Sequence, residues 1–287
     1  MFRRTLVGLA VLALSACGSP GPDTGDSKLT VVASFYPLQY LAERIGGDRV
    51  SVTSLTKPGA EPHDLELTPQ DVAALARTDL VVYLNGFQPA VDKAVDAQAF
   101  DVTASADLSA AQQGAVDPHF WLDPVRLKSV AAALADRLSA ADPAGAATFK
   151  ANAATVAADL ATLDKDFRTG LAGCTIRTLV TSHTSFGYLA DRYGLRQVGI
   201  TGLTPETEPD AGRLAEVSRL VRAQGVRTIY YETLVSPAVA DTIAQEAGVG
   251  TAVLDPLEGL TDRSPGQDYL AVMRANLASL KKGQACP

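Results

Sequence analysis

The chain of 287 residues is poor in several residue types from which binding sites and crosslinks are usually built. It has three histidines, three cysteines, two methionines and one tryptophan. Acidic residues outnumber basic ones, 32 to 25, and no run of basic residues occurs, so a nucleic-acid partner is not expected. The short metal-protease spacing HExxH is also missing, so sequence spacing alone indicates no metalloprotease.

The N-terminus has the pattern of a targeting segment. Arg3 and Arg4 precede a short apolar stretch, residues 6–14, which is too short to cross a bilayer as a helix. The sequence from Leu14 to Cys17 resembles the lipobox of bacterial lipoproteins, in which the cysteine becomes the lipidated first residue. We therefore expect a signal peptide over residues 1–16 and a flexible lipidated tether over residues 17–27. The alternative is an ordinary signal peptide with an incidental cysteine.

A long helix is predicted over residues 142–173. Asp142 suits the N-cap and Pro143 the first helical position, while Gly170 and Gly173 suit the end. A helix of about 28 residues would span roughly 42 Å, which is longer than one small lobe needs. Six apolar residues recur on one face: Phe149, Val156, Leu160, Leu163, Phe167 and Leu171.

The flanks of this helix resemble each other at a constant offset of 148 residues. Residues 30–46 align with residues 178–194, and residues 80–83 align with residues 228–231. Two matches at one offset favour a duplicated fold over one domain with a long core helix, and the period is too long for a solenoid.

Both flanks alternate short apolar runs with helical stretches, which is typical of a parallel sheet covered by helices. The prediction is an α/β protein with two similar lobes, joined by one long backbone helix and separated by a ligand cleft. The N-terminal lobe is expected over residues 28–141, the linking helix over 142–173, and the C-terminal lobe over 174–287. Strands are predicted at residues 31–33, 50–55, 80–84, 176–181, 197–200, 226–231 and 251–254.

All three histidines lie where a ligand of such sheets would bind, in turns or at the ends of predicted strands. His63 lies in the loop after the second strand, His119 in the turn DPHFWLDP, and His183 between a strand and a helix. Asp255 directly follows the last strand. Three imidazoles and one carboxylate form a tetrahedral set suited to zinc. For any single histidine, a hydrogen-bonded loop residue is the alternative.

Four motifs in this order resemble those of the zinc- and manganese-binding solute-binding proteins of bacterial ABC importers: EPHDLELTP, DPHFWLDP, TSHTSFGYLADRYGL and LDPLEG. The resemblance runs from about Leu29 to the C-terminus. It implies two α/β lobes joined by a rigid helix, with one divalent ion between them. By position it implies His63, His119, His183 and Asp255 as ligands, with Glu61 and Glu232 as alternatives to Asp255.

The resemblance also bears on the choice of metal and on the partners. Manganese-binding relatives typically have a glutamate at the position of His183, so zinc is favoured and manganese is the alternative. A histidine-rich loop, common in zinc relatives, is missing from residues 96–116. The resemblance implies an extracytoplasmic protein, anchored to the membrane by its lipid, that delivers one Zn²⁺ per chain to an ABC permease, and we expect a monomer.

With Cys17 lipidated, Cys174 and Cys286 remain as an even pair in an oxidising compartment. We expect a disulfide between them, and two free thiols are the alternative.

Two further functional classes stay open. An extracellular zinc hydrolase would use three histidines and an open fourth position, but it also needs a general base, for which Asp123 and Glu232 qualify only by being acidic. An adhesin is suggested only by the expected tether.

Overall fold

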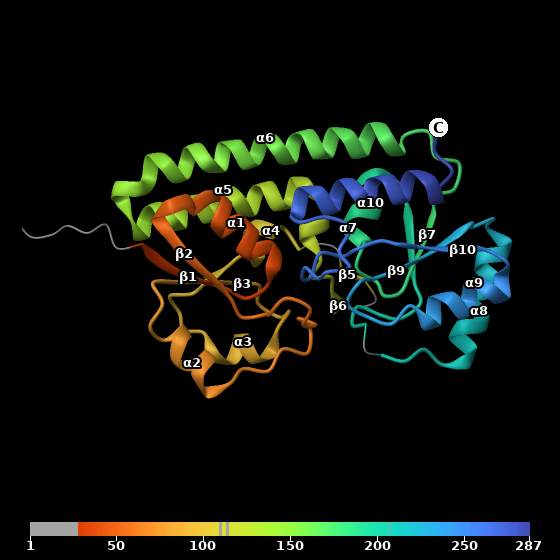
Figure 1. The fold of residues 1–287 in the computed structure, drawn as a ribbon, viewed down its shortest axis with the longest axis horizontal. Coiled ribbons are helices and arrows are strands. Elements are labelled where there is room, and N and C mark those ends of the chain that lie inside the picture. Colours follow the sequence, from red (N-terminus) through yellow and green to blue (C-terminus); the bar gives the residue numbers. More distant parts are fainter. Residues whose placement is uncertain (1–27, 109–110, 113–114, 206) are drawn as a thin grey trace, which may run out of the picture.

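The computed structural model describes residues 28–108, 111–112, 115–205 and 207–287. The expected signal peptide, Cys17 and the tether lie outside these residues. Two four-stranded sheets of parallel strands lie side by side beneath a long helix, which confirms the predicted fold class (Figure 1).

The first sheet has the strand order β2-β1-β3-β4, and helices pack on its faces. Its apolar strand β3 pairs in parallel with β1, as expected for a sheet buried on both sides. Its strands are β1 (Leu29–Ala33), β2 (Val50–Ser54), β3 (Leu80–Tyr83) and β4 (Phe100–Asp101), and its helices are α1 (Tyr36–Gly46), α2 (Pro69–Leu75), α3 (Pro89–Ala94) and α4 (Thr103–Ala106), with a 3₁₀ turn at Gly47–Arg49. A short antiparallel pair, β5 (Ala111–Gln112) and β6 (Ala115–Val116), follows.

The second sheet repeats the first. Its order β10-β9-β7-β8, read from the other end, places β7, β8, β9 and β10 where β1, β2, β3 and β4 lie in the first sheet. The shared connectivity supports the duplication that the offset of 148 residues indicated. Its strands are β7 (Thr178–Thr181), β8 (Arg196–Gly199), β9 (Thr228–Tyr231) and β10 (Gly250–Val253), and its helices are α7 (Gly187–Tyr193), α8 (Ala211–Ala223), α9 (Ala238–Ala247) and α10 (Tyr269–Gly283).

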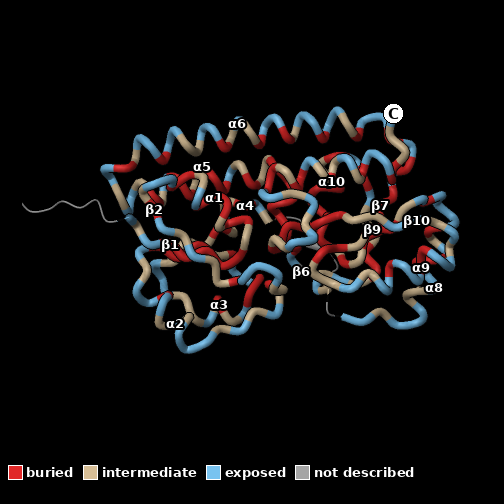
Figure 2. The backbone as a smooth tube through the Cα atoms, viewed as in Figure 1, coloured by how far each residue is buried: buried red, intermediate tan, exposed pale blue. Residues whose placement is uncertain are grey.

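The long helix α6 (Ala146–Leu171) contacts α1 and α5 on one side of the molecule and α10 and α7 on the other. The six apolar residues predicted to share a face are all buried, and Figure 2 shows that the opposite side of α6 is exposed. The helix begins later than predicted, because Asp142 caps a 3₁₀ turn at Pro143–Gly145 by accepting a hydrogen bond from the Gly145 N–H.

A second long helix, α5 (Pro124–Ala141), packs along α6 and was not predicted. In Figure 1, α5 lies beneath α6 over the first sheet, and α10 takes this place over the second sheet.

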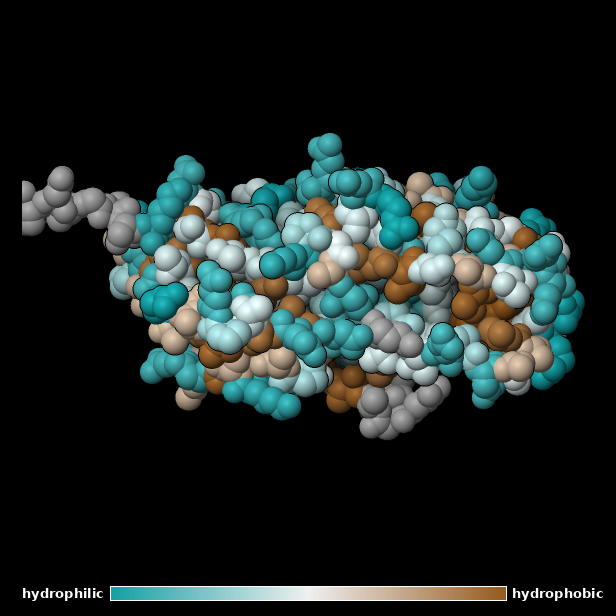
Figure 3. Space-filling model, turned by 60° about the horizontal axis from the view of Figure 1, so that its bottom comes forward, coloured by the Kyte–Doolittle hydropathy of each residue, from teal (hydrophilic) through white to brown (hydrophobic). Residues whose placement is uncertain are grey.

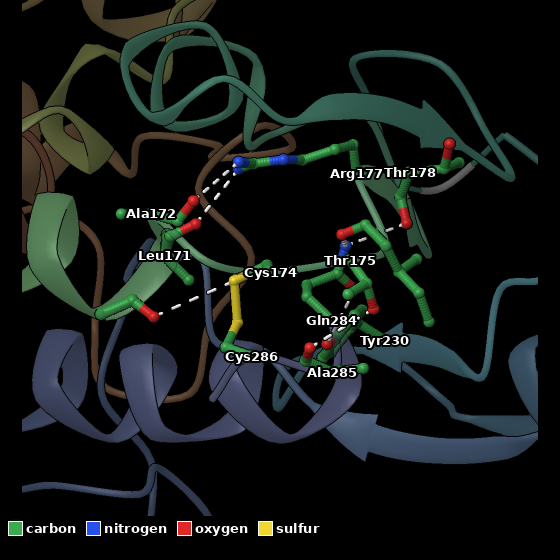
Figure 4. The surroundings of a disulfide bond; sticks show 12 residues. Leu171, Ala172, Cys174, Thr175, Arg177, Thr178, Tyr230, Gln284, Ala285 and Cys286 are labelled. Atoms are coloured by element: carbon green, nitrogen blue, oxygen red, sulfur yellow. Dashed lines mark hydrogen bonds between the residues drawn. A yellow bond between two sulfur atoms is a disulfide. The ribbon is translucent and has the colours of Figure 1, made fainter.

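The C-terminus is fastened to the second sheet. The structure joins Cys174 and Cys286 by a disulfide, and Figure 4 shows the tail beside the segment that leads into β7. The Gln284 amide donates to the carbonyl oxygens of Ile176 and Thr178, and the hydroxyl of Tyr230 donates to the Gln284 side-chain oxygen. These contacts hold the end of α10 against β7 and β9.

Candidate metal centre

Loops at the carboxyl ends of strands bring three histidines together between the lobes. His63 lies in the loop after β2, and His183 follows β7 by two residues. His119 immediately precedes a 3₁₀ turn at Phe120–Leu122. A fourth residue, Glu258, comes from the loop after β10. One ligand atom from each of the four residues lies within 4.8 Å of all the others.

The four side chains face one point. Glu258 Oε1 lies 2.9 Å from His119 Nε2, 3.3 Å from His183 Nε2 and 3.4 Å from His63 Nε2. The Nε2 atoms of His119 and His183 are 3.4 Å apart. Ligands about 2.0–2.1 Å from a tetrahedral zinc ion lie about 3.3–3.4 Å from each other. Three of the separations, 3.3, 3.4 and 3.4 Å, match the edges of such a tetrahedron, the His119–Glu258 separation of 2.9 Å is shorter, and no two of the four ligand atoms are more than 4.8 Å apart.

Carboxylates behind two of the rings determine which ring nitrogen faces the centre. His119 Nδ1 lies 2.6 Å from Asp117 Oδ1, and His183 Nδ1 lies 2.6 Å from Glu232 Oε1. A neutral histidine that donates its Nδ1 proton to a carboxylate presents the Nε2 lone pair on its other side. Two lone pairs that point at one space repel each other unless a cation lies between them, so the donor set fits a metal ion.

The centre is buried, and its charged groups lie close enough to shift one another's pKa. Burial disfavours a charged imidazole, but Asp117 and Glu258 outweigh burial and raise the pKa of His119. Glu232 and Glu258 likewise overcome burial and raise the pKa of His183 well above its ordinary value. Burial by itself would raise the pKa of the Glu258 carboxyl. The histidines, His183 foremost, nevertheless bring that pKa well below its usual range.

Aromatic rings pack against two of the histidines. The ring of Phe87 lies 4.8 Å from that of His63, and the indole of Trp121 lies 5.2 Å from that of His119. Trp121 is fully buried, and its indole N–H donates to the carbonyl of Pro256, 2.7 Å away. The turn that carries His119 is thereby attached to the loop that carries Glu258.

The structure brings together three of the four predicted ligands. Asp255 lies outside the cluster, because its carboxylate accepts hydrogen bonds from the Leu257 N–H and the Thr233 hydroxyl. Glu258 takes the fourth place, which the sequence patterns did not predict. Its signal was present, since Glu258 lies in the LDPLEG motif only three residues beyond Asp255.

The two alternative ligands also lie outside the cluster. Glu232 lies behind His183 as a hydrogen-bond acceptor, and Glu61 Oε1 accepts a hydrogen bond from the His63 backbone N–H. Each carboxylate therefore supports a histidine instead of pointing at the centre.

Within the part of the chain that the structure describes, no helix is both long and apolar enough to cross a membrane.

Curated proteins similar to the chain have names that refer to zinc. The zinc-binding lipoprotein AdcA of Streptococcus pneumoniae R6 is 37% identical over 96% of this chain, but the chain covers only 60% of AdcA. The high-affinity zinc uptake system protein ZnuA of Bacillus subtilis 168 is 33% identical, and the match covers 96% of this chain and 95% of that protein.

Solved structures agree with these matches. The Zn(II)-bound ZnuA-like domain of Streptococcus pneumoniae AdcA has a TM-score of 0.79 and 38% identity, covering 90% of this chain and 99% of that domain. The laminin-binding protein Lmb of Streptococcus agalactiae, described as a bifunctional protein with adhesin and metal-transporting activity, has a TM-score of 0.84 and 32% identity, covering 90% of this chain and 100% of Lmb. Residues 31–283 match the family described as zinc-uptake complex component A, periplasmic (ZnuA), and the chain belongs to this family.

Proposed function

We propose that this protein binds one Zn²⁺ outside the cytoplasm and delivers it to an ABC permease, with His63, His119, His183 and Glu258 as ligands. The observation that carries the proposal is the convergence of one ligand atom from each of the four residues within 4.8 Å of the others, with three of the separations near those of ligands around a tetrahedral zinc ion. The zinc-binding relatives and the family's role in zinc uptake support the choice of ion.

Zinc fits this donor set better than manganese does. Three imidazole nitrogens and one carboxylate oxygen, all buried or nearly so, suit a four-coordinate ion. Manganese prefers more oxygen ligands in an octahedral arrangement and is lowest in the divalent affinity order. We therefore expect manganese to compete poorly.

The membrane attachment belongs to the same proposal. A signal peptide over residues 1–16, a lipid on Cys17 and a tether up to residue 27 would keep the protein near its permease. The name lipoprotein of the pneumococcal relative supports this arrangement. The lobes are assigned to residues 28–141 and 174–287, with residues 142–173 linking them.

We infer that the protein acts as a monomer and not as an enzyme. On the face that Figure 3 turns forward, apolar side chains form separate patches among hydrophilic ones. The two acids considered as a general base for a hydrolase have other contacts. Asp123 caps α5 and pairs with Arg192, and Glu232 supports His183.

Calorimetric titration of the metal-free protein with zinc tests the ligand set. We expect one zinc per chain, and a strong loss of affinity in His63→Ala, His119→Ala, His183→Ala and Glu258→Gln, because each removes a donor or, for Glu258→Gln, the negative charge of one. Glu216→Gln is the matched control, since Glu216 is exposed on α8 and pairs only with Arg213 among the described residues. Undiminished affinity in any ligand variant would remove that residue from the site.

The same samples test the choice of metal and the stoichiometry. Trp121 lies against His119, so its fluorescence should change when the centre is filled, saturate at one zinc per chain, and respond little to excess manganese. Equal competition by manganese would contradict the zinc assignment, and a signal that needs two ions would contradict the single site.

A further inference from the structure

The loop that carries Glu258 has a strained backbone. Leu257, the residue immediately before Glu258, has φ +60° and is fully buried. A left-handed conformation is unfavourable for a residue other than glycine, because Cβ then crowds the following carbonyl oxygen. Such a conformation persists only where the surrounding structure holds it in place.

Asp255 supplies one of these constraints. Its side chain is almost fully buried at 1% exposure. Oδ1 accepts a hydrogen bond of 2.8 Å from the Leu257 N–H, and Oδ2 accepts one of 3.1 Å from the Thr233 hydroxyl. The carboxylate therefore forms one hydrogen bond to the strained residue Leu257 and another to the segment after β9.

Two other side chains hold the backbone just before Leu257. Asn276 of α10, itself 1% exposed, accepts from the Asp255 N–H at 2.9 Å and donates to the Asp255 carbonyl at 2.7 Å. The indole N–H of Trp121 donates a hydrogen bond of 2.7 Å to the Pro256 carbonyl oxygen. The backbone of residues 255–257 is thus hydrogen-bonded at every residue, which fixes the direction in which Glu258 leaves it.

We propose that Asp255 is a positioning residue for zinc: its carboxylate holds Leu257 in the left-handed conformation and so aims Glu258 Oε1 at the three imidazoles. The proposal rests on the proposed function, because it assumes that zinc is bound by the histidines and Glu258. The proposal gives a functional role to the buried carboxylate of Asp255, which points away from the centre.

A double-mutant cycle with zinc as the titrant tests the assignment. Asp255→Ala should weaken zinc binding about 10- to 100-fold, as expected for the loss of a group that orients a ligand. In the Glu258→Gln background, the same substitution should have little further effect, because the side chain that it orients no longer carries a charged donor. Asp255→Asn should retain most of the affinity, because its amide oxygen can still accept from the Leu257 N–H.

A spectroscopic readout separates positioning from general damage. With Co²⁺ in place of zinc, the visible absorption of Asp255→Ala should shift toward that of Glu258→Gln. Asp268→Ala, which removes the N-cap of α10, should lower stability without changing that spectrum. If Asp268→Ala weakens zinc binding as much as Asp255→Ala does, the effect is destabilisation and the proposal fails.

The outcomes distinguish this inference from the proposed function. An equal loss from Asp255→Ala in both backgrounds would overturn the positioning role and leave the ligand set intact. If Glu258→Gln alone binds zinc as tightly as the unaltered protein, the proposed ligand set is wrong. If Asp255→Asn is as defective as Asp255→Ala, the negative charge itself is needed and the hydrogen-bond argument is overturned.

Discussion

At the scale of single residues, the centre depends on carboxylates that do not face it. Asp117 and Glu232 each hold the Nδ1 of one histidine, so that Nε2 points inward with its lone pair. The same carboxylates, with Glu258, raise the pKa of His119 and His183 in the metal-free protein. Protons therefore compete with zinc for the nitrogens that the geometry aims at the ion.

This competition predicts how zinc affinity depends on pH. An imidazole must lose its Nε2 proton to bind zinc, and a free histidine does so near pH 6.5. Because the pKa of His119 and His183 is raised, affinity should begin to fall above pH 6.5 as the pH drops, and binding at neutral pH should release protons. Calorimetry in buffers of different ionisation enthalpy measures this release.

The stability of the metal-free protein should change in the opposite direction. Groups with a raised pKa in the folded state contribute stability that is fully present below their unfolded pKa and is lost as pH rises through the folded value. Thermal unfolding should therefore show that the metal-free protein loses part of its stability as pH rises above about 6.5. The stabilisation that added zinc gives should increase over the same range. Zinc affinity that does not change across this range would contradict the raised pKa of both histidines.

At the scale of elements, α10 connects the site with the C-terminal anchor. Asn276 near its middle clamps the loop of Glu258, and its last residue, Gly283, lies against β9. A Cβ added at Gly283 would lie 2.0 Å from the Tyr230 hydroxyl oxygen and 3.0 Å from Thr228 Cβ. Only glycine allows the helix to approach the strand this closely.

Gly283→Ala should therefore destabilise the protein, by about 1–3 kcal/mol if the clash resembles other cases of overpacking. The sign of the change in the free energy of unfolding is informative. In an ordinary helix interior, alanine is more stabilising than glycine by roughly 0.5–1 kcal/mol, so a loss of stability would indicate the clash. Urea denaturation measures the change. Gly202→Ala is the matched control and should be close to neutral, since among the described residues an added Cβ there has no atom within 4 Å beyond its chain neighbours. A more stable Gly283→Ala variant would show that α10 can move away from β9.

At the scale of the whole molecule, direct contacts between the lobes supplement the shared helix α6. The Tyr188 hydroxyl donates to the Asp117 carbonyl at 3.0 Å, and the Tyr269 hydroxyl donates to the Trp121 carbonyl at 2.6 Å. Arg192 pairs with Asp123 across the same boundary. These contacts surround the turn that carries His119, so the site lies where the two lobes are held together.

The disulfide extends this anchoring to the end of the chain. It joins residues 112 positions apart, a loop for which the chain-entropy estimate is about 4–5 kcal/mol. The variant Cys174→Ser with Cys286→Ser should unfold at a clearly lower urea concentration. Thiol titration of the unfolded, unreduced mature protein checks the bond directly, and two reactive thiols beyond Cys17 would contradict it.

The sequence by itself determined the repeated α/β lobes, the buried face of α6 and three of the four residues at the centre. These features follow local rules. Apolar periodicity identifies a helix face, an offset of 148 residues aligns two similar folds, and the end of a parallel strand locates a ligand residue. His63, His119 and His183 are also the only histidines in the chain, which left few alternatives.

Only the tertiary structure decided which carboxylates lie behind the histidines and which one faces the centre. Asp255 and Glu258 share one loop and both carry a carboxyl group, so their order in the sequence does not tell which one points inward. The choice depends on the left-handed backbone of Leu257, which is held by residues distant in the sequence: Thr233, Asn276 of α10 and Trp121 of the other lobe. Such long-range hydrogen bonds exist only once the lobes have packed, and that packing turns Asp255 away and Glu258 toward the centre.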